Sequence, residues 1–183
     1  ELSRVVLESN DAGAMYTGRD WGYRGTVIRF NFIHHVESIF GGSHGVYLDD
    51  AVSGFTVTSN IFYEINGIAM MAGGGRDHHF EHNIVVAAHR SAHHSDRRAR
   101  DAANYDWSGD FPGSWNLLGR INVDFSGPGR GDPIDHQSPP WSTSYPALAE
   151  IPDDWGSIAG SHWLDPEGCV FSRNLVDRSA GMM

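Results

Sequence analysis

A repeated asparagine, always in the same apolar setting, constrains the fold of this chain more than any other feature. Four segments carry an apolar residue three places before an Asn and another directly after it. They are residues 27–32, 56–61, 79–84 and 170–175, with asparagines at Asn31, Asn60, Asn83 and Asn174. Between them a second element opens at Gly13, Gly45 and Gly67, and a degenerate copy opens at Ser91. Two short strands in each period of about 22–25 residues predict the coils of a parallel β-helix.

Stacking explains why such a repeat is needed. One coil cannot bury its apolar side alone, so successive coils share a core. An Asn at one corner tolerates left-handed backbone geometry, and its amide can bond the amide of the next coil in a ladder. A β-sandwich with strands every 8–12 residues is the alternative. The repeated Asn register favours an all-β parallel β-helix (a solenoid) of a few coils with a long irregular loop insertion.

The composition changes near residue 100. All eight prolines lie between Pro112 and Pro166, and five of the six tryptophans follow residue 100. We therefore expect one domain with β-helix coils in 1–96, a long Trp- and Pro-rich loop in 97–166 and a final coil in 167–183. Because the loop is rich in aromatic residues, we expect it to be ordered and packed on the solenoid.

Charge and residue usage exclude several kinds of chemistry. The net charge of −10 argues against nucleic acid as a partner. All 13 basic residues are arginine, which excludes lysine Schiff-base chemistry and a P-loop lysine. The single Cys169 excludes an intramolecular disulfide and a multi-thiolate metal site.

No apolar run approaches the ~20 residues that span a bilayer, and the first residues do not form a secretory signal. We expect no membrane partner, and the chain is either mature from Glu1 or part of something longer.

Four segments carry a resemblance to a known group of proteins: residues 9–21, 45–50, 73–77 and 139–141. Together they resemble bacterial right-handed parallel β-helix repeat proteins of the pectate-lyase-like superfamily. The resemblance implies a right-handed solenoid, a polysaccharide or oligosaccharide partner and an extracytoplasmic or secreted location. It also implies that the chain is a fragment of a larger protein. Open solenoid ends then predict self-association, because terminal strands have unpaired edges.

Acidic and arginine residues recur in the turns that follow the glycine-led strands. If these turns align, they form one edge of the solenoid, where one carboxyl can act as an acid and another as a base or nucleophile. We predict a glycoside hydrolase whose catalytic candidates are Asp20, Asp49, Asp50 and Asp77. The substrate-binding candidates are Arg19, Arg76, Arg97, His93, Tyr47 and Trp21. Further aromatic candidates for stacking on sugar rings are Tyr23, Trp107, Trp115, Trp141 and Tyr145.

Two other functions stay open. Asp49, Asp50 and Asp77 offer hard oxygen ligands for calcium, so a calcium-assisted polysaccharide lyase with Arg76 or Arg97 as base is one alternative. The other is a non-catalytic module that binds glycan or acts as a scaffold, because Asp and Arg at solenoid turns often only cap turns and form surface ion pairs. The expected cofactor is therefore none, or calcium.

Overall fold

The computed structural model describes residues 1–102, 117–121, 134–159 and 161–180. Its strands form three parallel sheets, which we call A, B and C. Sheet A contains β1 (Leu2–Ser3), β4 (Phe32–Val36), β7 (Ile61–Ile65), β10 (Ile84–Ala88) and β13 (Leu175–Asp177). Sheet B contains β2 (Ala12–Gly18), β5 (Ser43–Asp49), β8 (Ile68–Gly73) and β11 (Ser91–Asp96). Sheet C contains β3 (Val27–Arg29), β6 (Thr56–Thr58), β9 (His79–Glu81) and β12 (Val170–Ser172).

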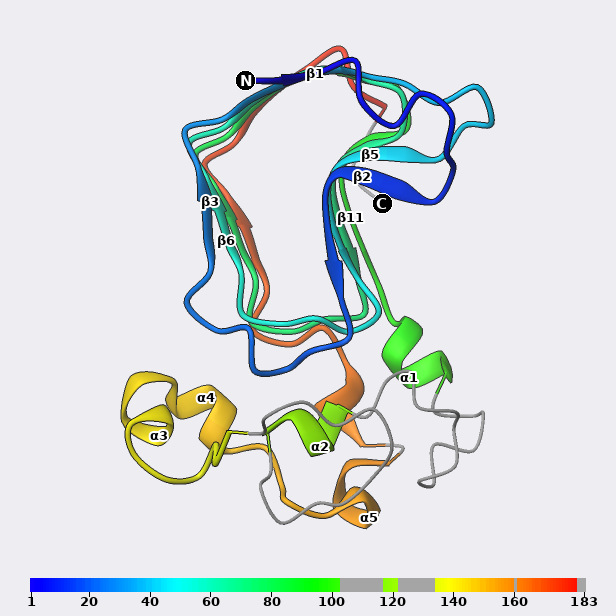
Figure 1. The fold of residues 1–183 in the computed structure, drawn as a ribbon. Coiled ribbons are helices and arrows are strands. Elements are labelled where there is room, and N and C mark those ends of the chain that lie inside the picture. The colour runs from blue at the N-terminus through cyan, green and yellow to red at the C-terminus, as the bar shows by residue number, and fades with distance from the viewer. Residues whose placement is uncertain (103–116, 122–133, 160, 181–183) are drawn as a thin grey trace.

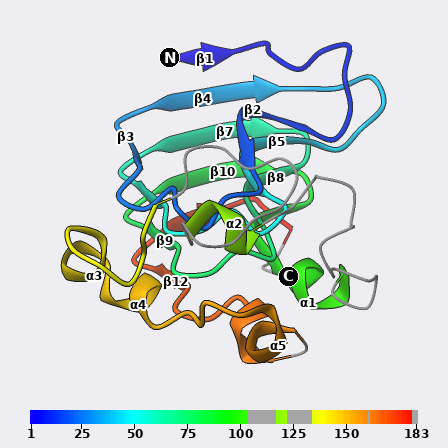
Figure 2. The ribbon, with the colours of Figure 1, turned by 60° about the horizontal axis from the view of Figure 1, so that its bottom comes forward.

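The chain visits the sheets in the order B, C, A, and each coil adds one strand to each sheet. Figure 1 shows the coils nearly end-on, with sheet A at the top, sheet C on the left and sheet B on the right. Turned by 60°, the sheet A strands β1, β4, β7 and β10 lie one below another (Figure 2). This arrangement is consistent with the all-β parallel solenoid predicted from the Asn repeat.

The four repeated asparagines form a continuous ladder along the corner between sheets C and A. The Oδ1 atom of Asn60 accepts bonds from the backbone N–H and the side-chain Nδ2 of Asn31, both at 3.0 Å. Asn83 accepts the same pair of bonds from Asn60, and Asn174 accepts them from Asn83. Every bond is donated towards the C-terminal end, so the ladder has one direction.

The left-handed backbone at this corner is not on the asparagines themselves, which corrects the expectation from the sequence. The residue before each Asn has φ between 54° and 59°: Phe30, Ser59, His82 and Arg173. A second such column, with φ between 49° and 57°, runs through sheet A: Arg4, His35, Glu64, Ala87 and Arg178. Left-handed backbone geometry is costly for residues other than glycine. The stacked neighbours must therefore impose it at the same place in each coil.

The glycines that open the second repeated element do not lie in register. Gly13 pairs with His44, and Val46 pairs with Met70, which places Gly45 beside Ala69. The alignment by glycine is therefore wrong by one or two residues, whereas the alignment by Asn is confirmed.

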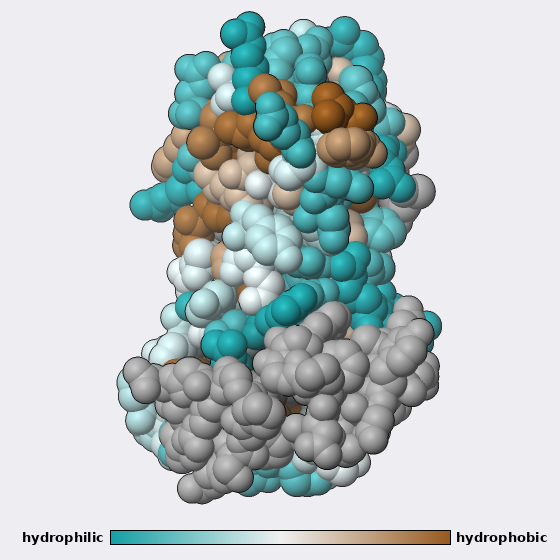
Figure 3. Space-filling view, turned by 45° about the vertical axis from the view of Figure 1, so that its right-hand side comes forward, coloured by the Kyte–Doolittle hydropathy of each residue, from teal (hydrophilic) through white to brown (hydrophobic). Residues whose placement is uncertain are grey.

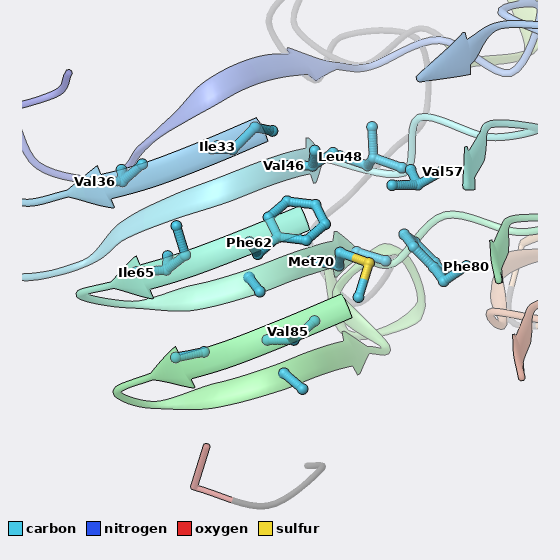
Figure 4. Packing of buried hydrophobic residues seen from close by; sticks show 14 of the residues in the cluster. Ile33, Val36, Val46, Leu48, Val57, Phe62, Ile65, Met70, Phe80 and Val85 are labelled. Carbon is cyan, nitrogen blue, oxygen red and sulfur yellow. The ribbon is translucent and has the colours of Figure 1, made fainter. Parts of the chain in front are cut away.

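The solenoid interior is a continuous apolar core. Inward-facing side chains of successive coils pack on one another, as Figure 4 shows for Phe62 and Met70 between neighbouring coils. Ten of these buried residues are labelled there: Ile33, Val36, Val46, Leu48, Val57, Phe62, Ile65, Met70, Phe80 and Val85. Burying each such side chain contributes about 1.5–3 kcal/mol, so stacking supplies most of the stability of the coils.

The chain between β11 and β12 leaves the solenoid and carries the helices, which gather below the coils in Figure 1. They are α1 (Arg98–Ala102), α2 (Leu117–Ile121), α3 (Trp141–Ser144), α4 (Pro146–Ala149), α5 (Trp155–Ile158) and the 3-10 helix η1 (His162–Leu164). Their apolar residues form a second cluster around Trp21 and Ala51 of the solenoid turns. Within the described ranges, no helix has the length and apolar character needed to cross a bilayer.

Candidate functional site

Strand register brings acidic residues together where the sheet B strands end. Asp49 pairs with Gly18 on one side. On its other side, Leu48 pairs with Ala72, which places Gly73 next to Asp49, and Gly73 in turn pairs with Asp96. Asp50 follows directly, with its carbonyl bound by the N–H of Arg19. We call the group of Asp49, Asp50, Asp96, Arg19, Arg98, Tyr16 and Tyr47 the Asp49 cluster.

Asp49 is the most fully coordinated member of the Asp49 cluster. Its Oδ2 accepts a bond from the Tyr16 hydroxyl at 2.9 Å, and its Oδ1 accepts one from the Asp50 N–H at 2.8 Å. The guanidinium of Arg98 also bonds Oδ1. Charge-assisted bonds of this kind stabilise an ionised carboxylate.

Asp50 lies in a different environment from its neighbour. Arg19 Nε contacts its Oδ2 at 2.7 Å, and Arg98 is 3.9 Å from its Oδ1. Burial raises the pKa of Asp50 above its ordinary value, although its bond to Arg19 acts in the opposite direction. Two adjacent carboxyls with different surroundings are the arrangement that separates an acid from a base.

Arg98, the first residue of α1, joins the separate parts of the Asp49 cluster. It bonds both oxygens of Asp96 and also donates to the Tyr47 hydroxyl at 3.2 Å. Although burial opposes its charge, the bonds to Asp96 and Tyr47 raise the pKa of Arg98. The insertion therefore supplies a cation that the solenoid carboxylates share.

Two tyrosines pack on one another in the Asp49 cluster, and only one of them is exposed. Tyr16 and Tyr47 are paired across β2 and β5, and their rings meet edge to face at 5.2 Å. Tyr47 is only 2% exposed, whereas Tyr16 is 54% exposed. Burial, followed by the bond to Asp49, raises the pKa of Tyr16 to about 12. Tyr16 therefore presents an ordered aromatic ring to solvent as a neutral phenol.

The other two predicted catalytic carboxylates lie elsewhere. Gly73, not Asp77, occupies the place beside Asp49, so the predicted alignment of the Arg76–Asp77 turn is wrong. Asp77 instead binds Arg24 at 2.5 Å. The buried Asp20 accepts a bond from the Gly22 N–H at 2.7 Å, and burial raises its pKa. The structure thus brings together Asp49 and Asp50 but leaves Asp20 and Asp77 outside the Asp49 cluster.

Four of the predicted substrate-binding residues also lie outside it. Trp21 is 1% exposed and belongs to the second apolar cluster, so its ring does not face solvent. His93 stacks on Phe171 inside the last coil, where burial lowers its pKa to about 4. Arg76 is buried beneath the Trp163 ring, and Arg97 lies 3.6 Å from Asp165. Arg19 and Tyr47 are the two that belong to the Asp49 cluster.

The proposed calcium ligands do not converge. The carboxylates of Asp49 and Asp50 contact Arg98 and Arg19, and Asp77 contacts Arg24. Across the part of the chain that the structure describes, no group of three or more His, Cys, Asp or Glu side chains has the geometry to hold a metal ion. These residues therefore do not fit the calcium site of a lyase.

The remaining aromatic candidates differ in exposure. Tyr23 is exposed beside Phe55, while Trp141 and Tyr145 pack against the second apolar cluster. Trp107 and Trp115 lie outside the described residues.

Hollows lie at several places on the described part of the solenoid. A cavity of about 310 Å³ opens at the N-terminal end, where Tyr16 and Tyr23 form part of its wall. A second hollow, of about 670 Å³, lies at the corner between sheets A and B and includes the exposed Leu7 and Ile39. Figure 3 shows apolar surface concentrated in the upper half of the face that it presents. The first hollow shares Tyr16 with the Asp49 cluster.

Tyr16, Asp96 and Arg98 were not among the predicted site residues. The signal for Tyr16 was present, because Tyr16-Thr17-Gly18 aligns with Tyr47-Leu48-Asp49 once the strands are placed in register. Asp96 and Arg98 belong to the last of the turns in which acidic and arginine residues recur, so the sequence placed them at this edge without assigning them a role.

Comparison with known proteins gives no assignment: no family model, curated protein or solved structure matches the chain.

Proposed function

We propose that this protein is a carbohydrate-binding β-solenoid whose site is the exposed side of the Asp49 cluster. The observation that carries the proposal is Tyr16, a half-exposed ring fixed by its bond to Asp49 and by its contact with Tyr47. A ring held in this way offers a face to a sugar at low entropic cost. The pectate-lyase-like resemblance of the sequence and a right-handed solenoid belong to the same proposal.

The charged groups support recognition of a polar ligand. Arg19, whose side chain is 47% exposed, lies beside Asp50, and the partly exposed Arg98 lies beside Asp49. Guanidinium and carboxylate groups side by side provide donors and acceptors for sugar hydroxyls. Since every carboxylate of the Asp49 cluster already has an arginine partner, the geometry supports binding better than it supports turnover.

The binding test compares two tyrosines on the outer surfaces of two sheets. Soluble polygalacturonate, xylan and a neutral β-glucan are titrated calorimetrically against wild type, Tyr16→Ala and Tyr63→Ala. Loss of one stacked ring from the site is expected to weaken binding of the preferred polymer at least tenfold in Tyr16→Ala. Tyr63, on β7 of sheet A, serves as the matched control and should leave the affinity unchanged. Equal affinity in all three proteins, or no binding of any polymer, refutes the proposal.

Hydrolysis is a second candidate, favoured by the raised pKa of Asp50 beside the well-coordinated Asp49. In this mechanism Asp50 donates a proton to the leaving oxygen and Asp49 acts as base or nucleophile. New reducing ends are measured for each polymer with wild type, Asp50→Asn and Asp77→Asn. Activity that is lost in Asp50→Asn and kept in Asp77→Asn supports hydrolysis. Activity that survives Asp50→Asn excludes this assignment.

A further inference from the structure

The apolar residue directly after each repeated Asn lies on the outside of the solenoid. The residue three places before the Asn faces the core, as Val57 and Phe80 do, and neither of these has any exposed surface. The residue directly after the Asn instead begins a sheet A strand and is between 39% and 58% exposed in each coil: Phe32, Ile61, Ile84 and Leu175. The core therefore does not account for this half of the repeat.

These four exposed residues form one continuous column, which we call the sheet A stripe. Each residue pairs with the next in the parallel register of sheet A, so their side chains stack about 4.8 Å apart. Figure 1 shows the helices on the opposite side of the coils from sheet A. Single exposed apolar residues are ordinary on a protein surface, whereas a contiguous apolar column indicates an interaction site.

Two further columns run beside the sheet A stripe, one on each side. On the side of the Asn ladder lie the left-handed corner residues: Phe30, Ser59, His82 and Arg173. Because alternate residues of a strand share a face, the next outward-facing residues of sheet A lie on the other side: His34, Tyr63, Val86 and Asp177. In each coil the two flanking residues are four places apart in the sequence, and the stripe residue lies midway between them.

A two-fold axis along the sheet A stripe makes this face complementary to itself. Such an axis sets a second copy face to face with the first, and each corner residue then lies opposite the other flank of the second copy at the same coil. Arg173 faces Asp177 of the second copy, so opposite charges meet, and Ser59 faces Tyr63, so two hydroxyl groups meet. This self-complementarity selects a second copy of the chain over an unrelated partner.

The size of this face sets the strength of the association. Coils about 4.8 Å apart and three columns of side chains about 7 Å apart make a face of roughly 20 by 20 Å, or about 400 Å² on each copy. Stable complexes of standard size bury about 800 Å² on each partner. Association through this face alone is therefore weak and reversible, and it is measurable only at high protein concentration.

We infer that the sheet A stripe is a self-association surface through which two copies of this chain form a closed dimer with parallel solenoid axes. The stripe residues of the two copies pack on one another, and Arg173 and Asp177 pair across the edges. The contacts are the same on both copies, so the dimer does not grow further through this face. The inference does not depend on carbohydrate binding, since it uses the lateral face of the coils and neither the Asp49 cluster nor an end of the solenoid.

The first test is sedimentation equilibrium between about 10 μM and about 1 mM protein, where we expect the average mass of wild type to rise towards twice that of the monomer. Ile84→Arg places a charge in the middle of the sheet A stripe and should weaken dimerisation at least tenfold. Val27→Arg, on the exposed side of β3 in sheet C, is the matched control and should stay within twofold of wild type. Circular dichroism verifies that both variants are folded, and Ile61→Arg repeats the test if Ile84→Arg does not fold.

The second test identifies the two-fold arrangement. Arg173→Asp and Asp177→Arg each set like charges opposite one another, so each should weaken dimerisation at least threefold. An equimolar mixture of these two variants brings opposite charges together at both edges and should restore dimerisation to within twofold of wild type. A monomer at every concentration, equal weakening by Ile84→Arg and Val27→Arg, or no restoration in the mixture overturns the inference. Association that Ile84→Arg leaves unchanged also overturns it, because the contacts then lie on another surface.

Discussion

Three histidines whose pKa is lowered by burial make the stability of this protein sensitive to mild acid. Nδ1 of His44 accepts a bond from the Ile68 N–H, and Nδ1 of His78 accepts one from the Phe55 N–H. Both roles require a neutral ring. Burial lowers the pKa of His44, of His78 and of His93 to about 4.

The direction in which stability changes with pH depends on whether the folded or the unfolded chain is protonated at the higher pH. An unfolded histidine has a pKa near 6.5, so as the pH falls the unfolded chain is protonated before the folded one. The stabilising contribution is complete above pH ~6.5 and is lost progressively towards pH ~4. At pH ~5 each histidine lowers the free energy of unfolding by about 2 kcal/mol relative to pH ~8, and three independent groups lower it by about 6 kcal/mol. That approaches the whole stability of an ordinary domain.

The assay is urea unfolding followed by circular dichroism between pH 8 and pH 5. His78→Gln retains a donor and an acceptor but cannot titrate, so its loss of stability over this range is expected to be about 2 kcal/mol smaller than that of wild type. His89→Gln, at an exposed position, should match the wild-type dependence. Burial raises the pKa of Asp20 and Asp50, so these two groups stabilise the folded state as the pH falls. Their effect is the same in wild type, His78→Gln and His89→Gln. If His78→Gln loses as much stability as wild type, the reasoning is refuted.

Three substitutions test other parts of the fold by the same unfolding measurement. Asn60→Ala leaves several partners of a buried amide unsatisfied and should lower the free energy of unfolding by about 3 kcal/mol. A change below ~1 kcal/mol would show that the ladder contributes little to stability. Phe30→Gly relieves left-handed strain at a 77% exposed residue and should stabilise the protein by up to ~1 kcal/mol. Phe32→Gly, within β4, should destabilise it. If neither variant is more stable than wild type, the strain argument is contradicted. Trp21→Ala should lower the free energy of unfolding by about 3–5 kcal/mol and expose residues 134–159 to limited proteolysis before the coils. Simultaneous cleavage of both would argue against a separate second cluster.

The sequence revealed the coil corner because one side chain performs one task in every coil. Asn31, Asn60 and Asn83 each need the same amide, so the repeat is visible as identity. The left-handed residues before them need only the same backbone angles, which Phe30 and His82 adopt without sharing any chemistry. No pattern of residue types in the sequence indicates this column of left-handed residues.

The candidate site was predictable only where residues adjacent in the sequence form it. Asp49 and Asp50 end a strand and stay together whatever the alignment. The alignment of Asp77 failed because β8 ends at Gly73, and three residues lie between that end and Asp77. Arg98 stands in the turn that the sequence placed at the same edge as Asp49, but its direct contact with Asp49 comes from the first turn of an insertion rather than from a coil.

The place where the insertion leaves the solenoid has a consequence for how the chain folds. The corner from β8 to β9 is closed by the few residues between Gly73 and His79, whereas the next corner must join Asp96 to Val170. Loop-closure entropy grows only logarithmically with length, so this longer connection costs about 2 kcal/mol more, which the second apolar cluster can offset. The last coil, however, cannot close until the ends of that long connection meet. The first three coils should therefore assemble from local contacts, and the fourth should join them last.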